Sequence, residues 1–103
     1  DWRQLMVDSY VVEITEDALN DLAEHMDYLI DTEGNPDKAL SLSDQFEASI
    51  DKIKENPHRA QKYGEGRRFK IQNTPYSIYM QVRELERKVV VTNIYHDKQN
   101  RPL

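Results

Sequence analysis

The fold is decided by the stretch Tyr76-Ser77-Ile78-Tyr79-Met80-Gln81-Val82-Arg83, in which apolar and polar side chains alternate. Successive side chains of a β-strand point to opposite faces of the sheet, so this alternation predicts a strand with one buried and one open face. The row that begins at Tyr76 is predicted to enter the core. The row that begins at Ser77, and includes Tyr79 and Arg83, is predicted to stay open.

Two further β-like segments flank this strand, at residues 67–72 and 88–96. Short polar turns connect all three segments, which favours an antiparallel meander. In the earlier segment Phe69 continues the core row, so Arg68 and Lys70 are predicted to be open. The later segment has three consecutive valines, which leaves its facing ambiguous. Its polar Asn93 favours the open face, together with Tyr95.

Upstream of the meander, residues 10–14 read as a short strand, and two amphipathic helices follow. Thr15 is predicted to cap the first helix, and Gly34 and Pro36 separate it from the second, which runs to about residue 55. Each helix carries one predicted core stripe. The stripes are Leu19, Leu22, Met26, Leu29 and Ile30 in the first, and Ala39, Leu42, Phe46, Ile50 and Ile53 in the second.

The order β-α-α-β-β-β predicts an α+β fold in which a helical hairpin covers one face of a small antiparallel sheet. A chain of 103 residues is expected to form a single domain over residues 1–103, with 1–8 as an irregular N-terminal segment. Residues around Tyr63 and Gly64 are interpreted as a flexible approach to the meander.

Composition excludes several classes of function. The chain has no cysteine, so a disulfide framework, a thiolate nucleophile and a zinc–thiolate site are excluded. No apolar run approaches the roughly 18 residues of a membrane span, and a cytoplasmic location is expected. His25, His58 and His96 lack ligand-spaced partners, so neither metal nor cofactor is predicted.

The net charge of −5 is distributed unevenly along the chain. Residues 1–51 hold 14 acidic residues against Arg3 and Lys38, whereas residues 52–103 hold 12 basic residues against five acidic ones. Overall acidity argues against broad affinity for nucleic acid, but the basic half can still present a local anion-binding face.

The predicted open face gathers cations and aromatic rings, with His96 at its strand end. Its members are Arg68, Lys70, Tyr79, Arg83 and Tyr95. Arginine binds phosphates and aromatic rings stack on splayed bases, so this pattern is typical of RNA binding. The alternative is that the same residues form the ordinary solvated face of an antiparallel sheet.

The order of the elements and several short motifs resemble the RelE/ParE superfamily of bacterial type II toxin–antitoxin toxins. The resemblance covers about residues 10–102. Its motifs are Tyr-Val-Val-Glu-Ile-Thr at 10–15, the helix with Ala18, Asp21 and Leu22, Gly66-Arg67-Arg68-Phe69, the run from Pro75 to Val82, and Val89-Val90-Val91 leading to Tyr95-His96-Asp97.

This resemblance implies a growth-inhibiting toxin that a cognate antitoxin holds inactive. One branch of the superfamily cuts mRNA on the ribosome without a metal, and the other poisons DNA gyrase. In the first branch, Arg68 and Arg83 are expected to stabilise phosphate charge, and Tyr95 or His96 to act as the acid. Glu65 is the candidate base. Lys70, Tyr79 and Arg67 are expected to bind RNA.

The net acidity keeps the alternatives open, because ribosome-dependent members are usually strongly basic. A gyrase inhibitor without nuclease activity is the second reading, and a non-toxic antitoxin-binding relic is the third. The predicted partners are the antitoxin and either the ribosome with mRNA or DNA gyrase. A homodimer and a toxin–antitoxin hetero-oligomer are both compatible with the sequence. The antitoxin's acidic residues are expected to meet Arg68, Lys70 or Arg83.

Overall fold

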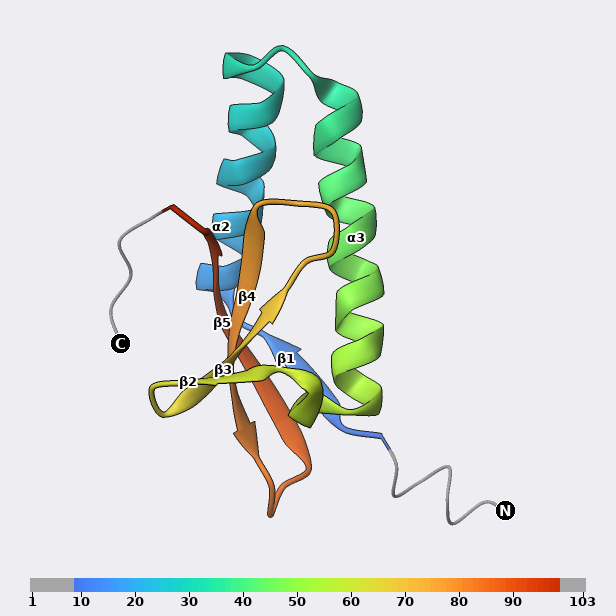
Figure 1. Cartoon of the computed structure of the whole chain (residues 1–103), viewed down its shortest axis with the longest axis vertical. Helices are drawn as coiled ribbons and strands as arrows, with labels where there is room; N and C mark the ends of the chain where they lie inside the picture. The colour runs from blue at the N-terminus through green and yellow to red at the C-terminus, as the bar shows by residue number, and fades with distance from the viewer. Residues whose placement is uncertain (1–8, 99–103) are drawn as a thin grey trace.

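The computed structural model describes residues 9–98, which form a five-stranded sheet and a helical hairpin (Figure 1). The α+β class and the hairpin-on-sheet architecture predicted from the sequence are confirmed. In chain order the elements are β1 Val11–Ile14, α2 Glu16–Asp27, a π-helical turn Tyr28–Thr32, α3 Pro36–Glu55, a 3₁₀ turn Pro57–Arg59, β2 Gln61–Tyr63, β3 Gly66–Lys70, β4 Tyr76–Arg83 and β5 Lys88–His96.

The strand order in the sheet is β1-β5-β4-β3-β2. Strands β3, β4 and β5 form the predicted antiparallel meander, and Arg68 lies opposite Tyr79 within it. Strand β1, in contrast, runs parallel to β5, with Ile14 opposite Val91. The sheet is therefore mixed, because the chain passes through the hairpin and the meander before its last strand returns beside its first.

Strand β2 was not predicted, and it corrects the interpretation of residues 63–66 as a flexible approach. Tyr63 pairs with Gly66 across the turn formed by Gly64 and Glu65, and Gly64 has the positive φ of 57° that such a tight turn favours. The three residues of β2 show no apolar alternation, so only backbone pairing defines this strand. This is why the periodicity of the sequence did not reveal it.

Local capping signals define the helical hairpin as predicted. Thr15 Oγ1 accepts a hydrogen bond from the Ala18 amide at 3.2 Å, and Asn35 caps α3 through the Lys38 amide. Gly34, with φ 63°, ends the first helix, and Pro36 begins the second. Figure 1 shows the two helices side by side, with their connection beyond one end of the sheet.

One hydrophobic core lies between the hairpin and the sheet. Leu29, Leu42 and Ile53 enter it from the helices, as predicted. The prediction was wrong for Leu19 and Ile30, whose side chains are 50% and 42% exposed. Ala18 is buried in place of Leu19, whereas Leu22, Met26 and Leu29 contact the core as predicted. None of the helices within residues 9–98 could span a membrane, since none combines sufficient length with apolar composition.

Side chains of α2 and of its cap, Thr15, contact the edge of β5 from the point where its pairing with β1 ends. Asp21 Oδ2 accepts a hydrogen bond from the Ile94 amide at 2.9 Å, and His25 Nε2 lies 2.7 Å from the Ile94 carbonyl oxygen. Thr15 Oγ1 donates to the Val91 carbonyl oxygen at 2.9 Å. The helix thus satisfies backbone groups that would otherwise form an unpaired strand edge.

Asp21→Ala should lower the free energy of unfolding by about 1–3 kcal/mol, because it leaves the Ile94 amide without its acceptor. Glu24→Ala, an exposed position on the same helix, is the matched control and should change stability by no more than about 0.5 kcal/mol. Urea denaturation measures both. Equal effects of the two substitutions would mean that the Asp21 contact does not stabilise the edge.

Candidate functional site

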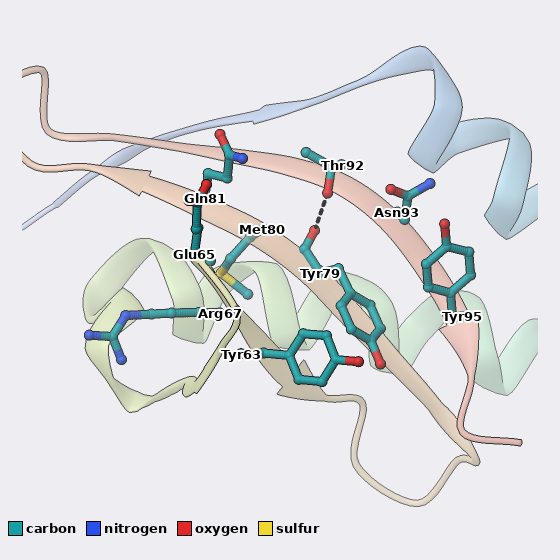
Figure 2. A pocket seen from close by; sticks show the side chains of 11 residues that line it. Tyr63, Glu65, Arg67, Tyr79, Met80, Gln81, Thr92, Asn93 and Tyr95 are labelled. Carbon is teal, nitrogen blue, oxygen red and sulfur yellow. Dashed lines mark hydrogen bonds between the residues drawn. The ribbon is translucent and has the colours of Figure 1, made fainter. Parts of the chain in front are cut away.

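The open face of the sheet carries a row of three tyrosines, from β2, β4 and β5 (Figure 2). The ring centroids of Tyr63 and Tyr79 are 5.3 Å apart, and those of Tyr79 and Tyr95 are 5.2 Å apart. Tyr79, in the middle, is only 8% exposed. Such ring separations are those of favourable aromatic pairs, so each ring helps to hold its neighbour in place.

The tyrosine row lines a shallow depression of about 570 Å³. Gly66 lies at its edge, and a Cβ atom there would come within 2.4 Å of the Met80 carbonyl oxygen. A side chain at this position would therefore force β3 away from β4. Glycine allows the two strands to approach closely and leaves the depression open beside Tyr63.

A β-bulge in β5 explains the ambiguous facing of that strand. Tyr79 pairs with Asn93 but Met80 pairs with Val91, so Thr92 is an additional residue. Thr92 Oγ1 donates to the Tyr79 carbonyl oxygen at 3.1 Å. The bulge lets Val91 enter the core while Asn93 faces the open side, which regular alternation would forbid because both have odd numbers.

Arg68 lies beside the tyrosine row. Its guanidinium carbon is 5.4 Å from the centroid of the Tyr63 ring, and its Nη2 donates to Gln61 Oε1 at 3.0 Å. Neither of these two partners is a carboxylate, so they orient the guanidinium without neutralising it. Arg67, the neighbouring cation, points away from the tyrosines in Figure 2 and donates to the Ala60 carbonyl oxygen at 2.7 Å.

Lys70 lies at one corner of the same face, where it forms an ion pair with Asp97. The buried Ser77 hydroxyl donates to the other oxygen of that carboxylate at 2.9 Å. Burial acts to raise the pKa of Asp97, but the hydrogen bonds from Lys70 and Ser77 outweigh it and hold the pKa below its ordinary value. Lys70 is thus engaged within the chain.

Arg83 is distant from this group. It lies four residues beyond Tyr79 along β4, or roughly 13 Å at about 3.3 Å per residue. It pairs with Lys88 across the strands, and its Nη1 is 3.7 Å from Glu86 Oε2. The structure therefore does not bring Arg83 together with Arg68.

The two candidate acids lie on opposite faces of β5. Tyr95 is opposite Ser77 on the open face, whereas His96 is opposite Tyr76, whose row faces the helices. The His96 ring packs edge-on against Tyr76 at 5.2 Å. Burial, followed by the charge of Asp21, raises the pKa of Tyr95. Tyr95 is thus a weaker acid than an ordinary tyrosine.

The structure brings together Arg68, Tyr79 and Tyr95, and places Glu65 in the exposed turn at the rim of the depression. Tyr63 was not predicted as a site residue, although the Gly-Glu-Gly turn that follows it is a local signal for a hairpin. The contact of Asn93 Nδ2 with Asp21 Oδ2 at 3.2 Å was not predicted either, and no local signal for it exists. Within the described part of the chain, no cluster of three or more histidine or acidic side chains could hold a metal ion.

The helical hairpin packed on this sheet, together with a family match, places the chain in the RelE/ParE superfamily of small toxins. A family model described as the ParE toxin of the type II toxin–antitoxin system parDE matches residues 12–101. The chain therefore belongs to the ParE toxin family and is the toxin component of a type II toxin–antitoxin system, whose partner is a cognate antitoxin.

Two solved structures have the same fold. One is described as the chromosomal ParDE toxin–antitoxin system of P. aeruginosa, with a TM-score of 0.71 and 15% identity over 86% of this chain and 97% of that chain. The other is the RelBE2 toxin–antitoxin complex of Mycobacterium tuberculosis, with a TM-score of 0.54 and 18% identity over 87% of this chain and 93% of that chain. A search of curated protein sequences finds no match.

The lowered pKa of Asp97 predicts that the contribution of this side chain to stability depends on pH. A carboxyl group with a depressed pKa stabilises the fold above its unfolded pKa of about 3.9, and loses this effect as the pH falls through the folded value. Asp97→Asn should therefore be less stable than the wild type at pH 6, and the difference should shrink toward pH 3. Urea denaturation across this range measures it. A difference that does not change with pH would contradict the assignment.

Proposed function

We propose that this toxin stops growth by binding DNA gyrase and that it does not cut RNA. The observation that carries the proposal is that Arg83 and His96, two of the residues expected for RNA cleavage, lie away from Arg68 and Tyr95. Cutting RNA through its 2′-hydroxyl requires a base, a cation and an acid around one phosphate. Here Arg83 is roughly 13 Å along the sheet from Tyr79, and His96 belongs to the opposite face.

Membership of the ParE family supports the same choice, because the gyrase-directed branch is the ParE branch of the superfamily. The electrostatics agree with it. A net charge of −5 opposes binding to the large anionic surface of the ribosome. In contrast, a concave row of tyrosines beside an arginine has the composition typical of protein–protein binding sites.

The proposal predicts different outcomes for two arginines on one sheet. Arg68→Ala should raise the toxin concentration needed to inhibit supercoiling by gyrase at least tenfold, because Arg68 lies beside the tyrosine row. Arg83→Ala, the matched control, should change it less than about twofold, since exposed ion pairs contribute little. The assay uses purified gyrase and relaxed plasmid.

Mapping of mRNA 5′ ends in intoxicated cells tests the alternative. New ends that disappear in both arginine variants would establish the ribonuclease reading and overturn the proposal. A chain that causes no growth defect at a verified protein level would instead be an antitoxin-binding relic.

We further propose that an acidic, extended segment of the antitoxin covers the open face beside Arg68. Arg68→Glu should then weaken antitoxin binding at least tenfold at 50 mM salt and by a smaller factor at 500 mM, because salt screens exposed charges. Arg83→Glu should have less effect, since Arg83 is far from the tyrosine row. Calorimetric titration measures both affinities. Equal losses for the two variants would show that only the overall charge of the face matters.

A further inference from the structure

A hollow of about 410 Å³ lies where the end of α2 meets the start of β4 and the end of β5. The side chains that give it its chemistry are Glu24, His25, Tyr28, Glu33, Tyr76 and His96. None of them lines the depression beside the tyrosine row, so the hollow is a site separate from the open face. Its volume lies within the range of about 300–1,000 Å³ that is usual for small-molecule sites.

Aromatic rings form the walls of this hollow. The centroid of the Tyr76 ring is 4.6 Å from that of His25 and 5.2 Å from that of His96. Tyr76 is only 4% exposed, whereas Tyr28 is 52% exposed. The hollow thus has packed aromatic walls and one accessible ring, that of Tyr28, on which a flat or cationic group can stack.

The π-helical turn Tyr28–Thr32 sets the spacing of two lining residues. The Glu33 amide donates to the Tyr28 carbonyl oxygen at 3.1 Å, a hydrogen bond between residues five apart. In a regular α-helix the partner of Tyr28 would be Thr32 instead. The wider turn therefore brings Glu33 into line with Tyr28, and both line the hollow. Turns of this kind are rare and often lie at functional sites, which favours a binding role here.

The polar groups of the hollow are mainly hydrogen-bond acceptors. His25 Nε2 lies 2.7 Å from the Ile94 carbonyl oxygen, which can only accept, so this nitrogen carries a proton. In the neutral ring, Nδ1 is then an acceptor. Glu24 and Glu33 add two carboxylates. Among the described residues of the lining, Lys38 is the only lysine or arginine, and its Nζ is 3.1 Å from Glu33 Oε1.

The hollow is electrically negative in spite of Lys38. The Glu24 carboxylate forms no hydrogen bond or ion pair within residues 9–98. Burial, followed by the charge of Glu33 and by Tyr28, raises the pKa of Tyr76, so the charge of Glu33 acts on the buried wall of the hollow. A phosphate or another anion would meet two carboxylates. These charges therefore favour a cation as the ligand.

We propose that this hollow binds a small molecule that carries a guanidinium group on a short aliphatic stem. Guanidinium is planar, always charged and donates from every nitrogen, which matches acceptors placed beside an aromatic ring. Glu24 and His25 precede Tyr28 by four and three residues, so all three lie on neighbouring positions of one helix face. The N–H groups of the ligand bond to the Glu24 carboxylate and to His25 Nδ1, and its plane stacks on Tyr28. The proposal does not depend on the target of the toxin.

Two probes of nearly the same shape test the ligand's chemistry, N-butylguanidinium and its neutral analogue N-butylurea. The wild-type toxin should bind butylguanidinium at least tenfold more tightly than butylurea at about 50 mM salt, and the ratio should fall at about 500 mM because salt screens exposed charges. Calorimetric titration measures the affinities. Equal affinities for the two probes, or no binding of butylguanidinium at millimolar concentration, would overturn the proposal.

Matched variants test the location of the site. Glu24→Gln removes the charge but keeps the shape, and Tyr28→Leu removes the accessible ring. Each should weaken binding of butylguanidinium at least fivefold, whereas Glu16→Gln, at an exposed acid of the same helix outside the hollow, should change it less than twofold. Circular dichroism melts verify that the variants stay folded. Equal effects of the two glutamine variants would mean that the probe follows only the overall charge of the helix, and would overturn the proposal.

A peptide distinguishes a free ligand from an arginine side chain of another protein. Gly-Arg-Gly with blocked ends carries the same guanidinium group within a polypeptide. It should bind more weakly than butylguanidinium, because the ligand proposed is a small molecule and the hollow has no further contacts for a main chain. Tighter binding of the peptide would assign the hollow to a protein partner and overturn the proposal.

Discussion

The hydrogen bonds between helix α2 and the edge of strand β5 are the constraint on which the rest of the structure depends. Strand β1 pairs with β5 only as far as Ile14, opposite Val91. Beyond that point Asp21 and His25 satisfy the backbone of Ile94. These contacts determine the rotation of α2 about its own axis, and therefore which of its side chains reach the core.

The rotation of α2 has consequences on both sides of the molecule. It directs Ala18 and Leu29 inward and leaves Leu19 and Ile30 at the surface. It also places Asp21 behind Asn93, at the margin of the tyrosine row, where its charge contributes to the raised pKa of Tyr95. The acidic hairpin and the aromatic open face are thus coupled through one strand, although they are separate surfaces.

Much of the architecture could be predicted because its signals are local. Thr15, Gly34 and Pro36 mark helix ends through their own capping and φ preferences. Alternation along β4 correctly assigned Ile78 to the core and Tyr79 to the open side. The candidate site was predicted only in part. Alternation assigns a side chain to one face of the sheet but not to a position on that face, so it could not show that Arg83 lies far from Arg68.

The sequence by itself therefore determined the position of the helical hairpin and of four of the five strands, the apolar side of β3 and β4, and the division of charge between the first and second halves of the chain. Only the tertiary structure decided the parallel pairing of β1 with β5, the three-residue strand β2, the bulge at Thr92 and the exposure of Leu19 and Ile30. The physical reason is that these features arise from contacts between residues far apart in the chain. Periodicity shows which face of a segment is apolar. Which other segment it pairs with or packs against depends on the backbone groups and side chains that those other segments supply.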